Sequence, residues 1–117
     1  MNIEDFRAVC LSKKGVTEEF PFDENTLTFK VVGRIFAIAD VDRFESINLK
    51  CDPEQSMELQ ELHDAVKPGY HMNKKHWITV SMDNSIPQSE ILQWIENSYQ
   101  LVVNGLTKSQ KSILQSL

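Results

Sequence analysis

Apolar residues recur with a period of two through the middle of the chain, which predicts a run of strands. Pro21 limits the segment between residues 16 and 25 to an edge strand or a loop. The connections are short, and Gly33–Arg34 is suited to a tight reversal, so an antiparallel meander is favoured. The clearest strands are predicted over residues 26–31, 35–39, 47–51 and 77–82.

A helical period marks the N-terminal segment and the segment after residue 51. Asn2 can cap the first helix, and Gly15 can take the left-handed conformation that ends it. Asp52–Pro53 supplies an N-cap followed by a proline, which predicts the start of the second helix, and Pro68–Gly69 ends it. The apolar face of this second helix is predicted to contain Leu59, Leu62 and Val66.

The C-terminal third begins with a long predicted helix that starts at Pro87 and breaks at Gly105. Thr107 and Gln110 form a capping-box pattern for a short terminal helix. The predicted order is a helix, four strands, a helix, a strand and a helix. This order predicts a two-layer α+β fold, with helices packed on a mainly antiparallel sheet of about five strands. Residues 1–117 contain no linker or repeat, so a single domain is expected.

The composition limits the classes of partner. The net charge of −5 argues against a general affinity for DNA or anionic membranes. However, residues 1–66 carry 7 basic and 14 acidic side chains, whereas residues 67–117 carry 5 basic and 3 acidic ones. Any basic surface is therefore local.

The chain also carries signals about its location. No apolar run approaches the ~20 residues needed to cross a bilayer, and the N-terminus does not resemble a signal peptide. We therefore expect a cytoplasmic protein with no membrane partner. In that compartment Cys10 and Cys51 are predicted to be reduced core thiols rather than a disulfide.

The segment PGYHMNKKHWITV, residues 68–80, contains two of the three histidines, two adjacent lysines and no acidic residue. Lysine and arginine can contact phosphates, and asparagine and histidine can add hydrogen bonds to phosphates or base edges, so a nucleic-acid-binding surface is one interpretation. Tyr70 and Trp77 could stack on bases, although Trp77 heads a strand and could instead be buried. The candidate binding residues are Lys30, Arg34, Lys67, His71, Asn73, Lys74, Lys75 and His76.

The histidines also raise the question of a metal. His63, His71 and His76 could supply three nitrogen ligands to zinc, but their spacing does not fix them on one side of any element. No nucleophile elbow or glycine-rich phosphate loop is present in the sequence. We therefore predict no metal site, no cofactor, no catalytic residues and no enzymatic activity.

Two other interpretations compete with nucleic-acid binding. In the first, His71, Asn73, His76 and Trp77 are structural and fix the Pro68–Gly69 loop onto the sheet. The protein would then act as a protein-interaction or chaperone-like module. In the second, the acidic face of the helix after residue 52 meets a basic partner, although such a face is more often solvent-exposed. The sequence does not specify an oligomeric state.

Three stretches of the chain, EEFPFDENTLTFKVVGRIFAI, PGYHMNKKHW and SYQLVVNGL, resemble the MmcQ/YjbR family of small bacterial proteins. His71, Asn73, Lys74, His76 and Trp77 match the family's most specific motif. The resemblance implies a frataxin-like or secretion-chaperone-like α+β fold. It also implies DNA binding through a double wing of β-hairpins, one of which would lie near Gly33–Arg34. It transfers no catalytic residue and no substrate.

Overall fold

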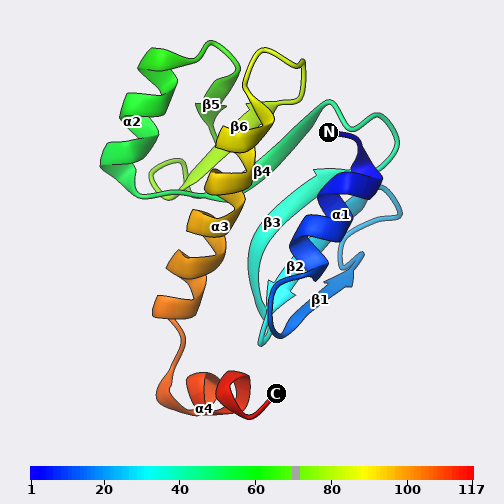
Figure 1. Ribbon diagram of the computed structural model, residues 1–117, viewed down its shortest axis with the longest axis vertical. Coiled ribbons are helices and arrows are strands. Elements are labelled where there is room, and N and C mark those ends of the chain that lie inside the picture. The colour runs from blue at the N-terminus through cyan, green and yellow to red at the C-terminus, as the bar shows by residue number, and fades with distance from the viewer. Residues whose placement is uncertain (70–71) are drawn as a thin grey trace.

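The computed structural model describes residues 1–69 and 72–117. Across these residues it contains four helices and one six-stranded sheet, which confirms the predicted α+β class and adds a strand to the expected five (Figure 1). The helices are α1 (Ile3–Leu11), α2 (Pro53–Leu62), α3 (Gln88–Asn104) and α4 (Lys108–Ser116). The strands are β1 (Val16–Glu19), β2 (Thr26–Val31), β3 (Arg34–Asp40), β4 (Ser46–Lys50), β5 (Val66–Pro68) and β6 (Trp77–Ser81). None of the described helices is both long and apolar enough to span a membrane.

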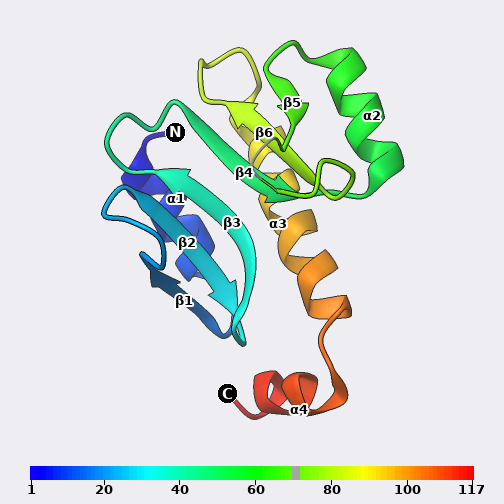
Figure 2. The same ribbon diagram turned by 180° about the vertical axis from the view of Figure 1, so that it is seen from behind.

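The sheet has the order β1-β2-β3-β4-β6-β5, and all neighbouring strands are antiparallel. The first four strands form the predicted meander, and β6 inserts between β4 and β5. Helices α1 and α3 lie across one face of the sheet, as Figure 1 shows. Seen from behind, the opposite face has none of the described helices over it (Figure 2). We call this side the open face.

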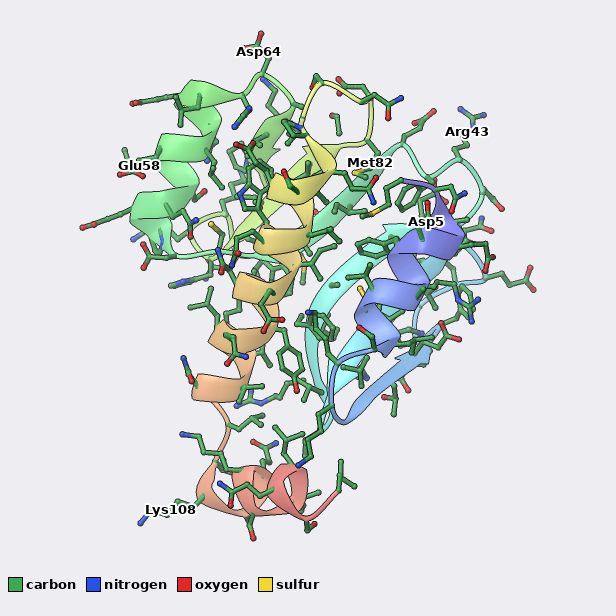
Figure 3. The ribbon with its side chains drawn as sticks, in the orientation of Figure 1. Asp5, Arg43, Glu58, Asp64, Met82 and Lys108 are labelled. Atoms are coloured by element: carbon green, nitrogen blue, oxygen red, sulfur yellow. The ribbon has the colours of Figure 1, made fainter. Side chains whose placement is uncertain are left out.

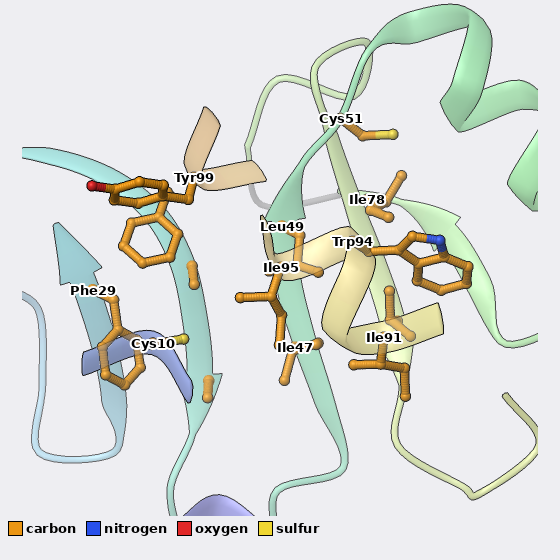
Figure 4. Packing of buried hydrophobic residues seen from close by; sticks show 14 of the residues in the cluster. Cys10, Phe29, Ile47, Leu49, Cys51, Ile78, Ile91, Trp94, Ile95 and Tyr99 are labelled. Atoms are coloured by element: carbon orange, nitrogen blue, oxygen red, sulfur yellow. The ribbon is translucent and has the colours of Figure 1, made fainter. Parts of the chain in front are cut away.

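The core lies between the sheet and the helices. In β2, alternate residues Leu27, Phe29 and Val31 are buried as the period of two predicted. Phe6 of α1 packs edge-on against Phe29, with ring centroids 5.6 Å apart. The buried stripe of α3 includes Ile91, Ile95, Tyr99 and Val102, and Figure 4 shows part of this packing.

Cys10 and Cys51 are both free thiols in the core, as predicted. Burial raises the pKa of Cys10 to about 12 and that of Cys51 to about 11. Because the thiolate is the reactive form, both side chains are poor nucleophiles in the folded protein.

The second helix ends earlier than the sequence predicted. Helix α2 ends at Leu62, and the backbone of His63 is extended, with φ −133° and ψ 118°. Val66 was predicted to lie on the helix but instead pairs with Val80 in β5, and Leu62 is 74% exposed rather than buried. The spacing of Val66 from Leu59 fits one face of a helix. However, an apolar residue at this position can equally be buried on a strand, as Val66 is. A strand of three residues that contains a proline gives almost no period-two signal.

The open face carries a row of residues in register across all six strands. In the spatial order of the strands, from β1 to β5, these are Glu19, Thr28, Ile38, Asn48, Thr79 and Lys67. The hydroxyl of Thr79 donates to Oδ1 of Asn48 at 2.7 Å, and the hydroxyl of Thr28 donates to the carbonyl of Glu19 at 3.1 Å. The row is mostly polar, as expected for an uncovered sheet face, although Thr28 is fully buried and Ile38 is only 9% exposed.

Ser98 of α3 joins β3 to β4 where the two strands separate. Their ladder covers only Ala37–Ala39 and Ile47–Leu49. Immediately beyond it, the Ser98 hydroxyl donates to the carbonyl of Phe36 at 2.5 Å and accepts from the backbone N–H of Lys50 at 2.8 Å. Ser98 is fully buried. One side chain therefore satisfies a carbonyl and an amide that would otherwise be left without partners at the end of the ladder.

We expect Ser98→Ala to destabilise the protein. The substitution leaves a buried donor and a buried acceptor unpaired, each at a cost of about 1–3 kcal/mol, so we expect a loss of about 2 kcal/mol or more in the free energy of unfolding. Urea titration followed by circular dichroism measures this loss. The control is Ser89→Ala in the first turn of the same helix, where the side chain is exposed and the change should stay within about 0.5 kcal/mol. Equal stability of the two variants would contradict the bridging role of Ser98.

Candidate functional site

A cleft of about 390 Å³ opens where β3 and β4 separate. On one side lies the β2–β3 hairpin, on the other the ends of β4 and β6, and behind it the C-terminal end of α3. Its described lining residues are Gly33, Arg34, Ile35, Lys50, Met72, Trp77, Val102 and Gly105. We call it the cationic cleft, because two of these residues are basic and none is acidic.

The β2–β3 hairpin positions Arg34 on one wall. Val31 pairs with Arg34, and the two residues between them, Val32 and Gly33, have φ values of 47° and 81°. Two positive φ angles match a type I′ turn, whose twist suits a two-residue hairpin. The reversal is therefore centred one residue earlier than Gly33–Arg34, and Arg34 becomes the first, exposed residue of β3.

Lys50 lies on the opposite wall, at the end of β4. It pairs with Trp77, whereas the neighbouring pair Leu49 and Ile78 belongs to the core. Because successive side chains on a strand point to opposite faces, Lys50 and Trp77 lie on the open face. The sequence prediction did not include Lys50. Its position in an alternating strand indicated only a solvent-facing side chain.

The two cations are not neutralised within the part of the chain that the structure describes. No described carboxylate lies within 4.0 Å of the charged groups of Arg34 or Lys50. By contrast, Lys13 is ion-paired with Glu96, and Lys30 with Glu19. Two unpaired cations that face one cleft favour an anionic group between them.

The segment from Met72 to Trp77 forms the rim of the cleft next to Lys50. Oδ1 of Asn73 accepts from the backbone N–H of Lys75 at 3.0 Å, so this side chain stabilises a turn. The carbonyl of His76 accepts from the N–H of Cys51 at 2.8 Å, which fixes the segment beside the end of β4. The side chains of Lys74, Lys75 and His76 are exposed.

Trp77 is only 9% exposed, so it cannot stack on a base. It lies outside the main core cluster, on the open face, and Gly69 lies close to its Cβ and its backbone carbonyl. The N–H of Gly69 donates to the carbonyl of Trp77 at 2.9 Å. A Cβ atom at residue 69 would lie 2.7 Å from the Cβ of Trp77 and 3.0 Å from its carbonyl oxygen. Only glycine permits this approach.

The structure brings some of the predicted site residues together and separates others. Arg34 contributes to the same cleft as Met72 and Trp77, which flank the predicted basic segment. Lys30 directs its ammonium to β1 through the ion pair with Glu19. Lys67 is exposed on the edge strand β5, two strands away from Lys50. Tyr70 and His71 lie outside the described residues.

His63 is separated from His76. Nε2 of His63 lies 3.5 Å from Oε2 of Glu90, and its ring packs against Trp94 at 5.5 Å between centroids. Val66, three residues after His63, pairs with Val80 near the C-terminal end of β6. His76 directly precedes Trp77, at the N-terminal end of the same strand. At ~3.3 Å per residue, the two positions are about 10 Å or more apart along the strand. Among the described residues, no three histidine, cysteine or acidic side chains form a metal-binding cluster.

The sequence model of the family described as YjbR matches residues 11–101. The chain belongs to the YjbR family. It is 33% identical over 118 residues to "Uncharacterized protein YjbR" of Escherichia coli K12, covering the full length of both chains. It is 42% identical over 90 residues to "Uncharacterized protein YbdF" of Escherichia coli O157:H7, covering 76% of this chain and 74% of that one.

Solved structures of similar proteins have the same fold. The crystal structure of Deinococcus radiodurans DR2400, with the domain DUF419, superposes with a TM-score of 0.91 at 38% identity, over 97% of this chain and 88% of that one. A crystal structure of a Pseudomonas syringae protein superposes with a TM-score of 0.72 at 27% identity, over 86% of this chain and 98% of that one. Both solved proteins therefore share the overall fold of this chain.

Two substitutions test whether the rim stabilises the fold or serves as a binding surface. Gly69→Ala introduces a Cβ against Trp77 and should cost about 1–3 kcal/mol, because the backbone cannot move aside cheaply. His76→Ala removes an exposed ring and should change stability by no more than about 0.5 kcal/mol. Thermal melts of both variants measure the difference. A large loss of stability in His76→Ala would support the structural interpretation of the motif and argue against its role as a surface.

Proposed function

We propose that this YjbR protein binds nucleic acid, without catalysing a reaction, through the cationic cleft and its rim. The observation that carries the proposal is the pair Arg34 and Lys50, which face one cleft from two strands and have no acidic partner among the described residues. Phosphate groups are the anions that nucleic acids present at regular spacing. Arginine and lysine are the side chains that most often contact them.

The cleft suits the phosphate backbone better than the bases. Trp77, the aromatic residue among the described lining residues, is buried and offers no stacking face. The exposed Lys75 extends the cationic surface along the rim. We therefore expect binding with little sequence preference and strong dependence on salt. The predicted contribution of Lys30 is weaker than expected from the sequence, because that lysine is already ion-paired.

The distribution of charge over the molecule favours approach of a nucleic acid from one end. No acidic residue follows Glu96 in the sequence, and Lys108 and Lys111 lie on α4, just beyond Gly105 of the cleft. Figure 3 shows Lys108 at one end of the molecule, and Glu58 of α2 and Asp64, just after this helix, at the other. A polyanion would be attracted to the α4 end and repelled by the α2 end, despite the net charge of −5.

Charge reversal at Arg34 tests the proposal. Fluorescence anisotropy with labelled duplex and single-stranded DNA, at low and at near-physiological salt, should show a loss of about tenfold or more in affinity for Arg34→Glu. The substitution removes one phosphate contact and introduces a repulsion. With two to four phosphate contacts, log Kobs should fall with log salt at a slope of roughly −2 to −4 for the unmodified protein.

The matched control for this experiment is Arg43→Glu. Arg43 is also an exposed arginine, but it lies near the acidic loops at the far end of the molecule from α4 (Figure 3). The control has the same net charge as Arg34→Glu and should retain most of the affinity. Lys75→Glu should give an intermediate loss. Equal losses in the two arginine variants, or no binding to either DNA at low salt by folded protein, would rule the proposal out.

A further inference from the structure

A second hollow, of about 620 Å³, lies on the open face of the sheet and has different chemistry. Ile38 of β3 and Asn48 of β4 form its floor. Phe22, in the β1–β2 loop, and Met72 border it, and Met72 also borders the cationic cleft. The remaining described lining residues are Asp23, Thr26, Asp40 and Ser46. We call this hollow the acidic groove, because it has two carboxylates and no cation among those residues.

Both carboxylates of the groove are fixed in place by the backbone. Asp23 accepts from the N–H groups of Asn25 and Thr26, at 2.8 and 2.6 Å, and from the Thr26 hydroxyl at 3.1 Å. These hydrogen bonds, that from Asn25 first, lower the pKa of Asp23 and keep it charged. Oδ1 of Asp40 accepts from the N–H of Asp42 at 3.0 Å. The other oxygen of each carboxylate retains capacity to accept from a ligand.

The acids have no basic partner within the described part of the chain. No described lysine, arginine or histidine lies within 4.0 Å of Asp23 or Asp40. The groove is therefore the electrostatic opposite of the cationic cleft. A phosphate backbone that lay across this half of the sheet would be repelled by two fixed negative charges.

Apolar surface accompanies the two carboxylates. Phe22, which borders the groove, is 69% exposed. Ile38 lies on the floor, outside the main core cluster. The amide of Asn48 is oriented by the Thr79 hydroxyl, which donates to its oxygen at 2.7 Å. The NH₂ group of Asn48 therefore remains as a donor for a ligand carbonyl.

We propose that the acidic groove binds a basic peptide segment of another protein. An arginine or lysine side chain of that segment would pair with Asp23 and Asp40, and a neighbouring apolar side chain would pack between Phe22, Ile38 and Met72. The Asn48 amide would donate to a peptide carbonyl. Charge complementarity favours a basic peptide over other ligands. The groove holds fixed carboxylates, an exposed aromatic ring and the Asn48 amide, which can hydrogen-bond to a peptide carbonyl.

The test is an NMR titration of ¹⁵N-labelled protein with the probe acetyl-Phe-Arg-Phe-amide. The proposal predicts that shift changes concentrate in residues 22–26, 38–40 and 46–48. The matched probe acetyl-Phe-Glu-Phe-amide should cause much smaller changes, because it places a carboxylate against two others. Equal binding of the two probes, or changes confined to other surfaces, would overturn the proposal.

Two variants with the same charge change locate the interaction. Asp40→Asn keeps an oxygen for the N–H of Asp42 but loses the negative charge, and it should weaken binding of the arginine probe about threefold to fivefold, the loss expected for one partly exposed ion pair. Asp42→Asn alters an exposed carboxylate beside the groove and should leave affinity unchanged. Phe22→Ala gives an independent check, because its exposed ring supports no core packing and its loss should also weaken binding. Equal affinities of all three variants would argue against this site.

Discussion

The buried hydroxyl of Ser98 is the contact on which the shape of the sheet depends. Antiparallel strands normally satisfy their backbone groups along the whole ladder, and strands that part must find other partners for them. Here β3 and β4 part after three pairs, and a side chain from α3 bridges the carbonyl of Phe36 and the N–H of Lys50. The helix is thus attached to the sheet at the point where the sheet divides, and the cleft forms directly beyond that point.

This division explains why basic residues far apart in the sequence reach the same place. Arg34 begins β3 and Lys50 ends β4, so a continuous ladder would hold them on adjacent strands with no space between. Because the strands separate, both residues line one cleft, whose back is closed by Val102 of α3 and by Gly105, which follows the helix. The separation that leaves the carbonyl of Phe36 and the N–H of Lys50 to be bridged by Ser98 is therefore the same geometry that opens the cleft.

Local patterns predicted most of the fold. The alternation from Thr26 to Val31 and the proline at residue 87 act within a few residues, and both elements formed where expected. Strand β5 was missed because Val66 satisfies helical spacing and because a partner distant in sequence, Val80, determines its burial. Arg34 was included in the predicted surface, whereas Lys50 was not. Its position in the cleft follows from the hydrogen bond of its N–H to Ser98, which lies 48 residues away and has no distinguishing local signal.

The open face carries charges of opposite sign at its two ends, and this constrains how the protein meets any partner. Asp40 and Lys50 lie on neighbouring antiparallel strands, near opposite ends of the face, with Ile38 and Asn48 between them. A long polyanion laid across the whole face would gain attraction at one end and lose it at the other. On the proposed function, nucleic acid would therefore approach from the hairpin and α4 end. That approach leaves the acidic half of the sheet facing away from the polyanion and accessible to solvent. The two surfaces are thus suited to different chemical partners, although they share one side of a single sheet.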